Sequence, residues 1–487
     1  MVSRETVWVV ALACALAGLV AAAAWARYGL LSAWPEPVGV DGYWYAVQLR
    51  SLLEEGRTAD PALPAALWFL VPFAAALGPI GGLKLGAAIG VSLHSLTAFA
   101  LGRALARSSA AGLVAAAVVA TSPGSIYLTT EFVKQGIALT LLAGFLAALA
   151  LARERPNRGT IALAAAAGAA AALSHKLAFA IALGALGAVL VAEVRRRPRE
   201  RRWLAALVAL GLATAGFLAV TRARWLGLVG GDAELTLPAL RFPSGVALRF
   251  GHEAALAAAV AVALVGLELA RRRRHSGPLA GSPVGWTLVG LALATALPWL
   301  AVDDPDGIGF RLRLSAHLAL APLAGVLLAA LLRDRRKRAA GALAVAVALV
   351  AMRPLAREEG VVRPNPALVA AAARVAADLP PDAEIVSPDR LVAFLLTWQT
   401  RRPARTRPGD GALGMRTWRI VPAAWLDAES AAALPPGPLV AVTEATWRAT
   451  LSRLTPAARR RWDEWDQTGS LPPPRRRRYD GFFGEEP

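Results

Sequence analysis

Long runs of apolar residues, separated by short polar segments, dominate this chain. Runs of about 18 or more apolar residues are long enough to cross the hydrocarbon core of a bilayer as helices. We therefore expect an all-α polytopic membrane bundle of about eleven transmembrane helices. Their predicted ranges are 6–28, 85–106, 109–128, 136–152, 160–175, 177–194, 203–221, 252–270, 284–302, 314–332 and 339–353.

One apolar segment is too short to join this set. In "PALPAALWFLVPFAAALG" the uninterrupted apolar part runs from Ala65 to Leu77, about 13 residues, which suits an interfacial or re-entrant helix better than a span. If it did cross the membrane, every later polar loop would change sides. We therefore predict a juxtamembrane helix here.

The charges set the predicted orientation. Apolar residues make up 56% of the 487 residues and charged ones 18%, yet the net charge is +19. The basic residues fall in bursts between apolar runs, a pattern typical of cytoplasmic loops and not of a nucleic-acid-binding face. The bursts are Arg103 and Arg107; Arg153, Arg155 and Arg158; "RRRPRERR" from Arg195; "RRRRH" from Arg271; and "RDRRKR" from Arg333.

Beyond residue 353 the chain becomes rich in Pro, Arg and Trp. "NPALVAAAARVAADLPPDAEIVSPDRLVAFLLTW" predicts helix, turn, strand and helix, and "GPLVAVTE" predicts another strand. We expect a transmembrane bundle at 1–353 with an external loop at 29–84, a small extracytoplasmic α/β C-terminal domain at 354–470, and a disordered basic tail at 471–487. The Ala and Arg enrichment suggests a bacterial source, so the predicted location is a bacterial cytoplasmic (inner) membrane, with the active site and C-terminus outside.

The stretch "VGVDGYWYAVQLRSLLEEG" opens the external loop with one apolar stripe, formed by Tyr45, Leu49, Leu52 and Leu53. Polar side chains fill the rest of the surface, which predicts an amphipathic helix lying flat on the outer membrane face. Asp41 stands at the start of this helix. It is either an N-cap, since Asp is favoured there, or a catalytic carboxylate at the mouth of the bundle.

The order of motifs along the chain resembles one family. Asp41, Tyr45, Arg50, Leu53 and Gly56 have the spacing found in the first external loop of the GT-C superfamily of membrane glycosyltransferases, particularly the branch of the aminoarabinose transferases and protein mannosyltransferases. Further motifs follow in the same order: "SPGSIYLTTEFVKQG" with Glu131, "ALSHKLAFA" with Lys176, and "FRLRLSAHLALAPLAGVLLA" with Arg311 and Arg313. The resemblance covers roughly residues 6 to 400 as an ordered pattern.

Three features depart from the family pattern. Gly42 stands where a second acidic residue often follows the loop-one Asp, and Ser174 and His175 precede Lys176 in place of the usual Thr. The Asp-x-Asp pair of oligosaccharyltransferase catalytic subunits is absent at Asp41, where the chain reads Asp-Gly-Tyr, and their "WW-x-x-G" signature is absent from the sequence. The resemblance therefore disfavours N-glycosylation.

The resemblance implies transfer of a sugar from a polyprenyl-phosphate donor to a lipid, glycan or protein acceptor outside the cytoplasm, with inversion. Asp41 would be the general base, and Lys176, Arg311 and Arg313 would stabilise the leaving phosphate. Glu131 would orient the sugar or the acceptor, or help hold a divalent cation, which is possible but not required. The remaining expected substrate-binding residues are Tyr45, Arg50 and His317.

Each of these residues also has a structural interpretation. Glu131 and Lys134 could form a loop ion pair, Lys176 could extend to the membrane interface, and the two arginines could anchor their helix to lipid headgroups. His94 is expected to bridge helices, whereas the role of His317 stays open. "DDPDG" at 303–307 is expected to be a solvated turn.

Three other classes of protein stay open. A transporter of lipid-linked glycans would favour inverted repeats and broken helices with polar residues near mid-bilayer, and we detect neither in the sequence. An O-antigen-type polymerase or ligase would carry its reactive loop late in the chain. A non-catalytic GT-C-like assembly protein is compatible with Gly42.

Overall fold

The computed structural model describes residues 3–39, 41–59, 65–220, 250–271, 278–279, 281–297, 308–332, 364–405, 416–426, 431–456, 459–460, 462–463 and 466. These residues belong to two compact units. The bundle unit comprises residues 1–30, 63–69 and 87–360, and the tail unit comprises residues 31–62, 70–86 and 361–487. The predicted span 339–353, the boundary at 353–354, the turn 303–307 and the basic tail 471–487 lie outside the described residues.

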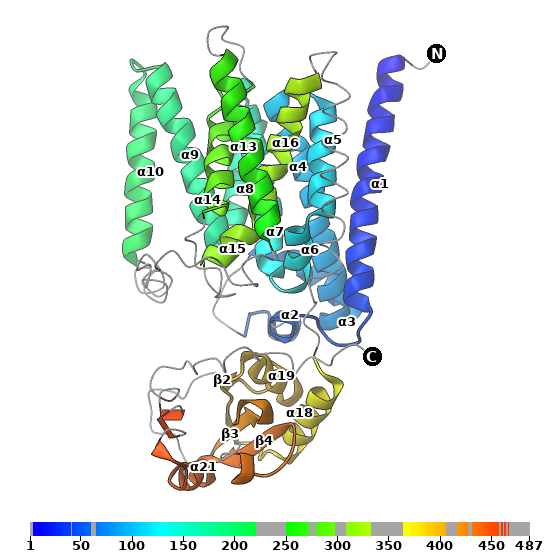
Figure 1. Ribbon diagram of the computed structural model, residues 1–487, viewed down its shortest axis with the longest axis vertical. Helices are drawn as coiled ribbons and strands as arrows, with labels where there is room; N and C mark the ends of the chain where they lie inside the picture. Colours follow the sequence, from blue (N-terminus) through cyan, green and yellow to red (C-terminus); the bar gives the residue numbers. More distant parts are fainter. Residues whose placement is uncertain are drawn as a thin grey trace. The chain divides into compact units, whose positions relative to one another are not determined.

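The bundle unit consists of helices that run side by side (Figure 1). Each of the first ten predicted spans overlaps one or two of them within the described residues. They are α1 (Arg4–Ser32), α4 (His94–Ala106), α5 (Ser109–Thr121), α6 (Pro123–Thr130), α7 (Val133–Glu154), α8 (Arg158–Ser174), α9 (Lys176–Arg196), α10 (Arg201–Val220), α13 (Gly251–Arg271), α14 (Pro283–Thr295), α15 (Ile308–Leu314) and α16 (Ala316–Leu332).

Six helices among the described residues are long and apolar enough to cross a membrane, or seven if the bent pair α5–α6 forms one span. The chain is therefore a multi-pass membrane protein. The predicted number of about eleven spans is not confirmed, because helices such as α8 and α14 are apolar but shorter than 18 residues.

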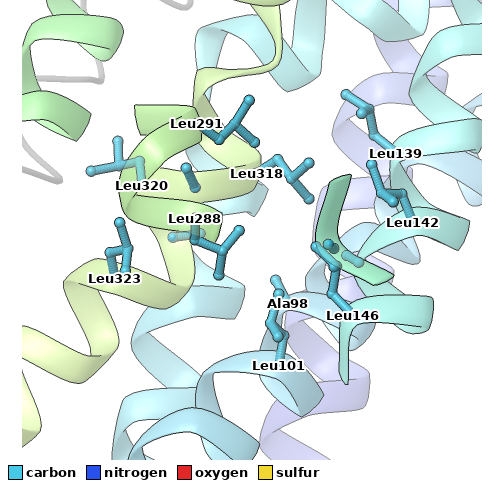
Figure 2. Close-up of a cluster of buried hydrophobic side chains, with 14 of the residues drawn as sticks. Ala98, Leu101, Leu139, Leu142, Leu146, Leu288, Leu291, Leu318, Leu320 and Leu323 are labelled. Carbon is cyan, nitrogen blue, oxygen red and sulfur yellow. The ribbon is translucent and has the colours of Figure 1, made fainter. Parts of the chain in front are cut away.

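Leucine side chains from four helices form the centre of the bundle core. Leu101 of α4, Leu142 of α7, Leu288 of α14 and Leu318 of α16 are all less than 2% exposed and belong to one cluster (Figure 2). The four helices are far apart in the sequence, so this cluster holds the early and the late segments of the bundle unit together.

Helices α5 and α6 meet at a bend of 50° around Ser122. The side chain of Arg27 donates to the Val119 carbonyl at 3.3 Å, near the C-terminus of α5. The Glu253 carboxylate accepts from the Ser122 hydroxyl at 2.5 Å and from the Gly124 N–H at 3.1 Å, at the N-terminus of α6. The guanidinium of Arg27 thus faces the C-terminal end of α5, which carries partial negative charge. The carboxylate of Glu253 faces the N-terminal end of α6, which carries partial positive charge. This broken helix with buried ionisable groups was not expected from the sequence.

Helix α3 (Ala65–Ser92) reverses direction at Gly78, whose φ of 75° and ψ of 165° are not helical. Only glycine adopts this conformation without strain. The reversal makes α3 a helical hairpin whose second arm is packed through Gly82, Gly86 and Gly90 against residues 69–74 of the first arm. The first arm is the segment predicted to be a juxtamembrane helix. Residues 65–106 are one of the six stretches long and apolar enough to cross a membrane, so this assignment stays a prediction.

We expect the Gly82→Ala variant to be markedly destabilised, because a Cβ atom at this position would lie 2.2 Å from both N and Cα of Ala74. Backbone atoms cannot move aside as a flexible side chain can, so the cost should reach or exceed about 3 kcal/mol, the upper end for overpacking. The unfolding midpoint of the purified protein measures the effect. Gly18→Ala in α1 is the control, since its Cβ would meet nothing within 4 Å. Equal midpoints for the two variants would contradict the hairpin.

The tail unit contains a four-stranded mixed sheet with strand order β2-β1-β3-β4. β1 (Glu384–Val386) pairs in parallel with β2 (Ala404–Arg405) and with β3 (Thr417–Pro422), and β3 pairs antiparallel with β4 (Leu439–Thr443). The helices of the unit are α2 (Gly42–Glu55), α18 (Pro366–Asp378), α19 (Arg390–Thr400) and α21 (Glu444–Leu451), with a 3-10 turn at Ala423–Trp425. The predicted order of helix, strand, helix and later strand matches α18, β1, α19 and β4.

Candidate functional site

Asp41 is held by an ion pair in the tail unit. It occupies the N-cap position of α2, but its side chain makes no capping hydrogen bond. Its Oδ1 lies 3.1 Å from Nη2 of Arg390, the first residue of α19, and only 8% of Asp41 is exposed. Asp41 therefore stands at the N-cap position, as expected, but its side chain does not cap the helix. The side chain is oriented by Arg390 instead.

The segment before Asp41 is fixed by two further polar side chains. Nζ of Lys84 donates to the carbonyls of Trp34 and Pro35. The Tyr43 hydroxyl donates to the Glu36 carboxylate. Burial, together with that hydrogen bond and the carboxylate charge, raises the pKa of Tyr43 well above its usual value, so the phenol remains a donor.

The missing second acid at Gly42 has a local packing explanation. A Cβ atom on Gly42 would lie 3.0 Å from Cβ and 3.1 Å from the carbonyl carbon of Pro37. Any side chain here would push against the chain that leads into Asp41. The tail unit therefore accommodates a single carboxylate at this point.

Helix α2 is bound to the end of α19 through Arg50. Its guanidinium donates to the carbonyls of Trp398, at 2.8 Å, and Thr397, at 3.1 Å, two of the last four carbonyls that a helix leaves unpaired. The guanidinium also lies 4.6 Å from the centre of the Trp398 ring. Burial lowers the pKa of Arg50 from its usual value. Its observed contacts are structural, and its predicted binding of substrate stays a prediction.

The position predicted for α2 on the membrane surface stays a prediction. Ten of its fourteen residues are buried, among them Gln48 at 2% exposure, whereas Glu54 and Glu55 of its polar face are exposed. Tyr45 is 3% exposed, and its ring packs edge-on against Trp44 with a centroid separation of 5.0 Å. The polar face is buried in part because α19 covers α2.

In the bundle unit, basic side chains gather around His175. The ring lies within electrostatic range of Arg311, Lys134 and Lys176, which we call the cation cluster. Nη1 of Arg311 is 3.5 Å from Nε2 of the ring. The other ring nitrogen, Nδ1, accepts from the Leu177 N–H at 3.2 Å and so caps α9. The cluster therefore brings together α7, α9 and α15, at ends that the charge pattern predicts to be external.

Glu131 lies at the edge of this cluster. It follows the last residue of α6 and is 3% exposed. The Arg311 guanidinium lies 4.4 Å from the ring centre of the next residue, Phe132. The side-chain amide of Gln135 donates to the Arg311 carbonyl at 2.9 Å. The junction of α6 and α7 thus contains a buried carboxylate next in sequence to the aromatic residue that Arg311 contacts.

The other two predicted residues of the bundle unit lie in different surroundings. Arg313 is 5% exposed and donates to the carbonyls of Thr295, at 3.4 Å, and Leu297, at 3.3 Å, at the end of α14. It therefore anchors a helix end inside the unit and not a lipid headgroup. His317 is fully buried, and its ring centre is 5.1 Å from that of His94. The two rings pack between α4 and α16, and bridging by hydrogen bonds from His94 stays a prediction.

Sequence analysis missed several residues of these sites. Arg390 follows Asp389, whose carboxylate caps α19 by accepting from the Val392 N–H at 2.9 Å. That capping signal could have placed Arg390 at a helix start, but nothing near it in the sequence indicates Asp41. Lys84 lies in an apolar hairpin and carries no motif.

Comparisons with known proteins bear on the fold of the described helices. No protein-family model and no curated protein matches the sequence. Among solved structures, the chain is similar to the oligosaccharyltransferase of Archaeoglobus fulgidus in its complex with zinc and sulfate, with a TM-score of 0.54 and 14% identity over 83% of this chain and 68% of that one. At this identity the likeness shows a shared fold.

Two structures of ArnT from Cupriavidus metallidurans also match. The apo state gives a TM-score of 0.49 at 16% identity, covering 91% of this chain and 99% of that one. The structure bound to undecaprenyl phosphate gives 0.48 at 15% identity, with the same two coverages.

Proposed function

We propose that the protein is an integral-membrane glycosyltransferase that moves a sugar from a polyprenyl-phosphate donor to an acceptor outside the cytoplasm, with inversion. The observation that carries this proposal is the state of Asp41. A carboxylate at the loop-one position of a GT-C fold is nearly buried and oriented by an ion pair, which structural capping alone does not require. The cell membrane concerned is the bacterial cytoplasmic membrane, with Asp41 on its outer side.

The proposed reaction is a single displacement. An acceptor hydroxyl or amine attacks the anomeric carbon, the bond from that carbon to the phosphate oxygen breaks, and Asp41 takes the proton of the attacking group. The polyprenyl phosphate leaves as an anion and needs no protonating acid. It needs positive charge, because charge develops on its oxygen in the transition state.

The cation cluster suits the leaving phosphate. Arg311 and Lys176 approach His175 from two helices, and charge-assisted hydrogen bonds from such groups to phosphate are short and strong. Lys176 is also the first residue of α9, where the helix dipole favours an anion. Arg313, which is bonded to the end of α14, supports the bundle instead. Glu131 would orient the sugar or the acceptor beside Arg311.

Arg390 is proposed as a positioning residue for Asp41. We expect Arg390→Gln to lower kcat by about 10-fold, because the carboxylate loses the partner that orients it. This loss is smaller than the rate factor usually contributed by a general base, since Asp41 itself is still present. KM for the donor should stay unchanged, and Arg390→Lys should restore part of kcat. Steady-state transfer assays measure both constants. A proportional rise in KM, or no rescue by lysine, would argue against positioning.

The break between α5 and α6 favours a second candidate, a transporter of lipid-linked glycans. Transporters place discontinuous helices and buried ionisable residues at their binding sites, and Arg27, Glu253 and Ser122 form such an arrangement. Here, however, both charges are bonded to the helix ends created by the break, so a structural role accounts for them.

Mass spectrometry of envelope glycans and lipids after deletion of the gene tests the proposal. A transferase predicts the loss of one sugar from an acceptor and accumulation of its polyprenyl-phosphate donor. A transporter predicts a complete lipid-linked glycan trapped on the cytoplasmic leaflet. Unchanged glycans and lipids would contradict both functions and favour the non-catalytic assembly protein.

A further inference from the structure

The bundle unit contains a cavity at the helix ends opposite to those of the cation cluster. Its volume is about 420 Å³. It is lined by the C-terminal ends of α4, α7 and α9, the N-terminal turn of α14 and the last turns of α16. These ends carry the arginine bursts that predict the cytoplasmic side. In Figure 1 they lie at the upper end of the helices.

The cavity has an apolar wall and a charged rim. Ala104, Leu105, Val284, Val326, Ala329 and Ala330 supply the wall. Arg107, Arg153, Arg196 and Glu154 supply the rim. An apolar wall beside basic side chains is the arrangement that accommodates an acyl chain and its phosphate headgroup together, and basic pockets between transmembrane helices on the cytoplasmic side bind acidic lipid headgroups.

The arginine side chains at this rim outnumber the carboxylates that pair with them. Glu193 is the carboxylate shared by three arginines: Arg153 at 2.8 Å, Arg197 at 3.6 Å and Arg196 at 3.9 Å. Glu193 is nearly buried, whereas the Arg196 side chain is 59% exposed. Arg197 has a second partner in Glu200, at 3.6 Å. The rim arginines Arg107, Arg153 and Arg196 thus pair with two carboxylates, Glu154 and Glu193, and the net positive charge that remains attracts an external anion.

The remaining rim arginine is also open to a ligand. Arg107 directs Nε and Nη2 to a single oxygen of Glu154, at 3.1 and 2.8 Å, and its side chain is 77% exposed. A planar guanidinium can bind a carboxylate on one edge and a phosphate on another. Arg107 and Arg196 therefore lie on the rim with exposed donors, while Arg153 is held by Glu193 and by the Gly281 carbonyl.

We propose that this cavity binds the phosphate diester of an anionic phospholipid from the cytoplasmic leaflet, with one acyl chain along the apolar wall. Arg107 and Arg196 bind the phosphate, and Leu105 and Ala329, which are partly exposed, contact the chain. A free phosphate ion would use the rim but leave the apolar wall exposed to water. The site is distinct from the proposed donor site, because the cation cluster lies at the other ends of α7 and α9.

Thermal unfolding of the purified full chain in neutral detergent tests the proposal with three additives: phosphatidylglycerol, phosphatidylcholine and sodium phosphate. Phosphatidylglycerol should raise the midpoint by several degrees, about 4–8 °C at concentrations well above the dissociation constant. The zwitterionic lipid and sodium phosphate should raise it by less than half as much. An equal shift with sodium phosphate would overturn the lipid assignment, and no shift with phosphatidylglycerol would overturn the site.

Matched variants distinguish a specific binding site from general electrostatic attraction to acidic lipids. Arg107→Gln with Arg196→Gln should abolish the phosphatidylglycerol shift. Arg155→Gln with Arg158→Gln removes the same charge from the same end of the bundle outside the cavity and should keep the shift. Equal losses in the two double variants would show unspecific attraction and overturn the proposal.

A third variant keeps the test valid if the arginine variant fails to fold. Ala329→Phe leaves every charge in place and fills the apolar wall. Native mass spectrometry should then detect fewer bound phosphatidylglycerol molecules than on the unaltered chain, by one per protein. An unchanged number of tightly bound lipids would contradict a chain along this wall. Sugar transfer is not measured in these experiments, so their outcome is independent of the proposed function.

Discussion

Replacing Asp41 by Asn should lower kcat/KM for sugar transfer by about 10³-fold, within the range attributed to general base catalysis. The amide keeps the size of the carboxylate but cannot accept the proton of the attacking group. The protein should still insert and fold, because Asp41 makes no capping bond to α2. Transfer of a labelled sugar by the purified protein in lipid nanodiscs measures the effect, and the elution profile of the variant reports its folding.

Glu55→Gln is the matched control for this substitution. Glu55 is the last residue of α2, its side chain is 52% exposed, and it pairs with the exposed Arg57. Removing this charge should leave transfer within a factor of about two, since exposed pairs contribute little free energy. Normal transfer by the Asp41→Asn variant would remove Asp41 from the chemistry, and a similar loss in both variants would indicate a general effect of charge in the loop.

The second large effect is expected at Arg311. Arg311→Gln should lower kcat by about 10²–10³-fold, the usual cost of removing one preorganised group that stabilises developing charge. Arg311→Lys should recover part of the rate, because the charge returns without the guanidinium contact to Phe132. Turnover of a polyprenyl-phosphate sugar at saturating donor concentration measures kcat directly.

Arg313→Gln separates catalysis from support of the bundle. It removes the donors to the carbonyls of Thr295 and Leu297, so it should cost about 1–3 kcal/mol of stability. Turnover per folded molecule should change little. If the folded Arg313 variant loses turnover as steeply as the Arg311 variant, both arginines serve the leaving phosphate and the distinction drawn here is wrong.

Helix positions in the bundle unit were largely predictable, because a bilayer demands long apolar segments. The predicted span 252–270 corresponds to α13 (Gly251–Arg271). The breaks were not predictable from hydropathy alone. Ser122 and Ser315 interrupt spans whose apolar content is continuous, and the groups that stabilise the first break, Arg27 and Glu253, come from distant parts of the sequence.

The two sites differ in how much the sequence indicates. The spacing after Asp41 identified the loop and its carboxylate, since a helix motif is local. Arg390 was missed because it meets Asp41 only through the packing of α19 on α2, and no local pattern encodes that contact. His175 was recorded only as a departure from the family motif, although Nη1 of Arg311 lies 3.5 Å from its ring.

The contacts that join α2 to α19 have a consequence for biosynthesis. Arg50 has its carbonyl partner at Trp398, 348 positions later, and the Asp41–Arg390 ion pair likewise needs a residue of α19. A ribosome-bound intermediate in which α19 has not yet been made therefore lacks both contacts. The Asp41 carboxylate acquires its orientation only after α19 has been synthesised, so a product truncated before α19 would contain α2 without these two contacts.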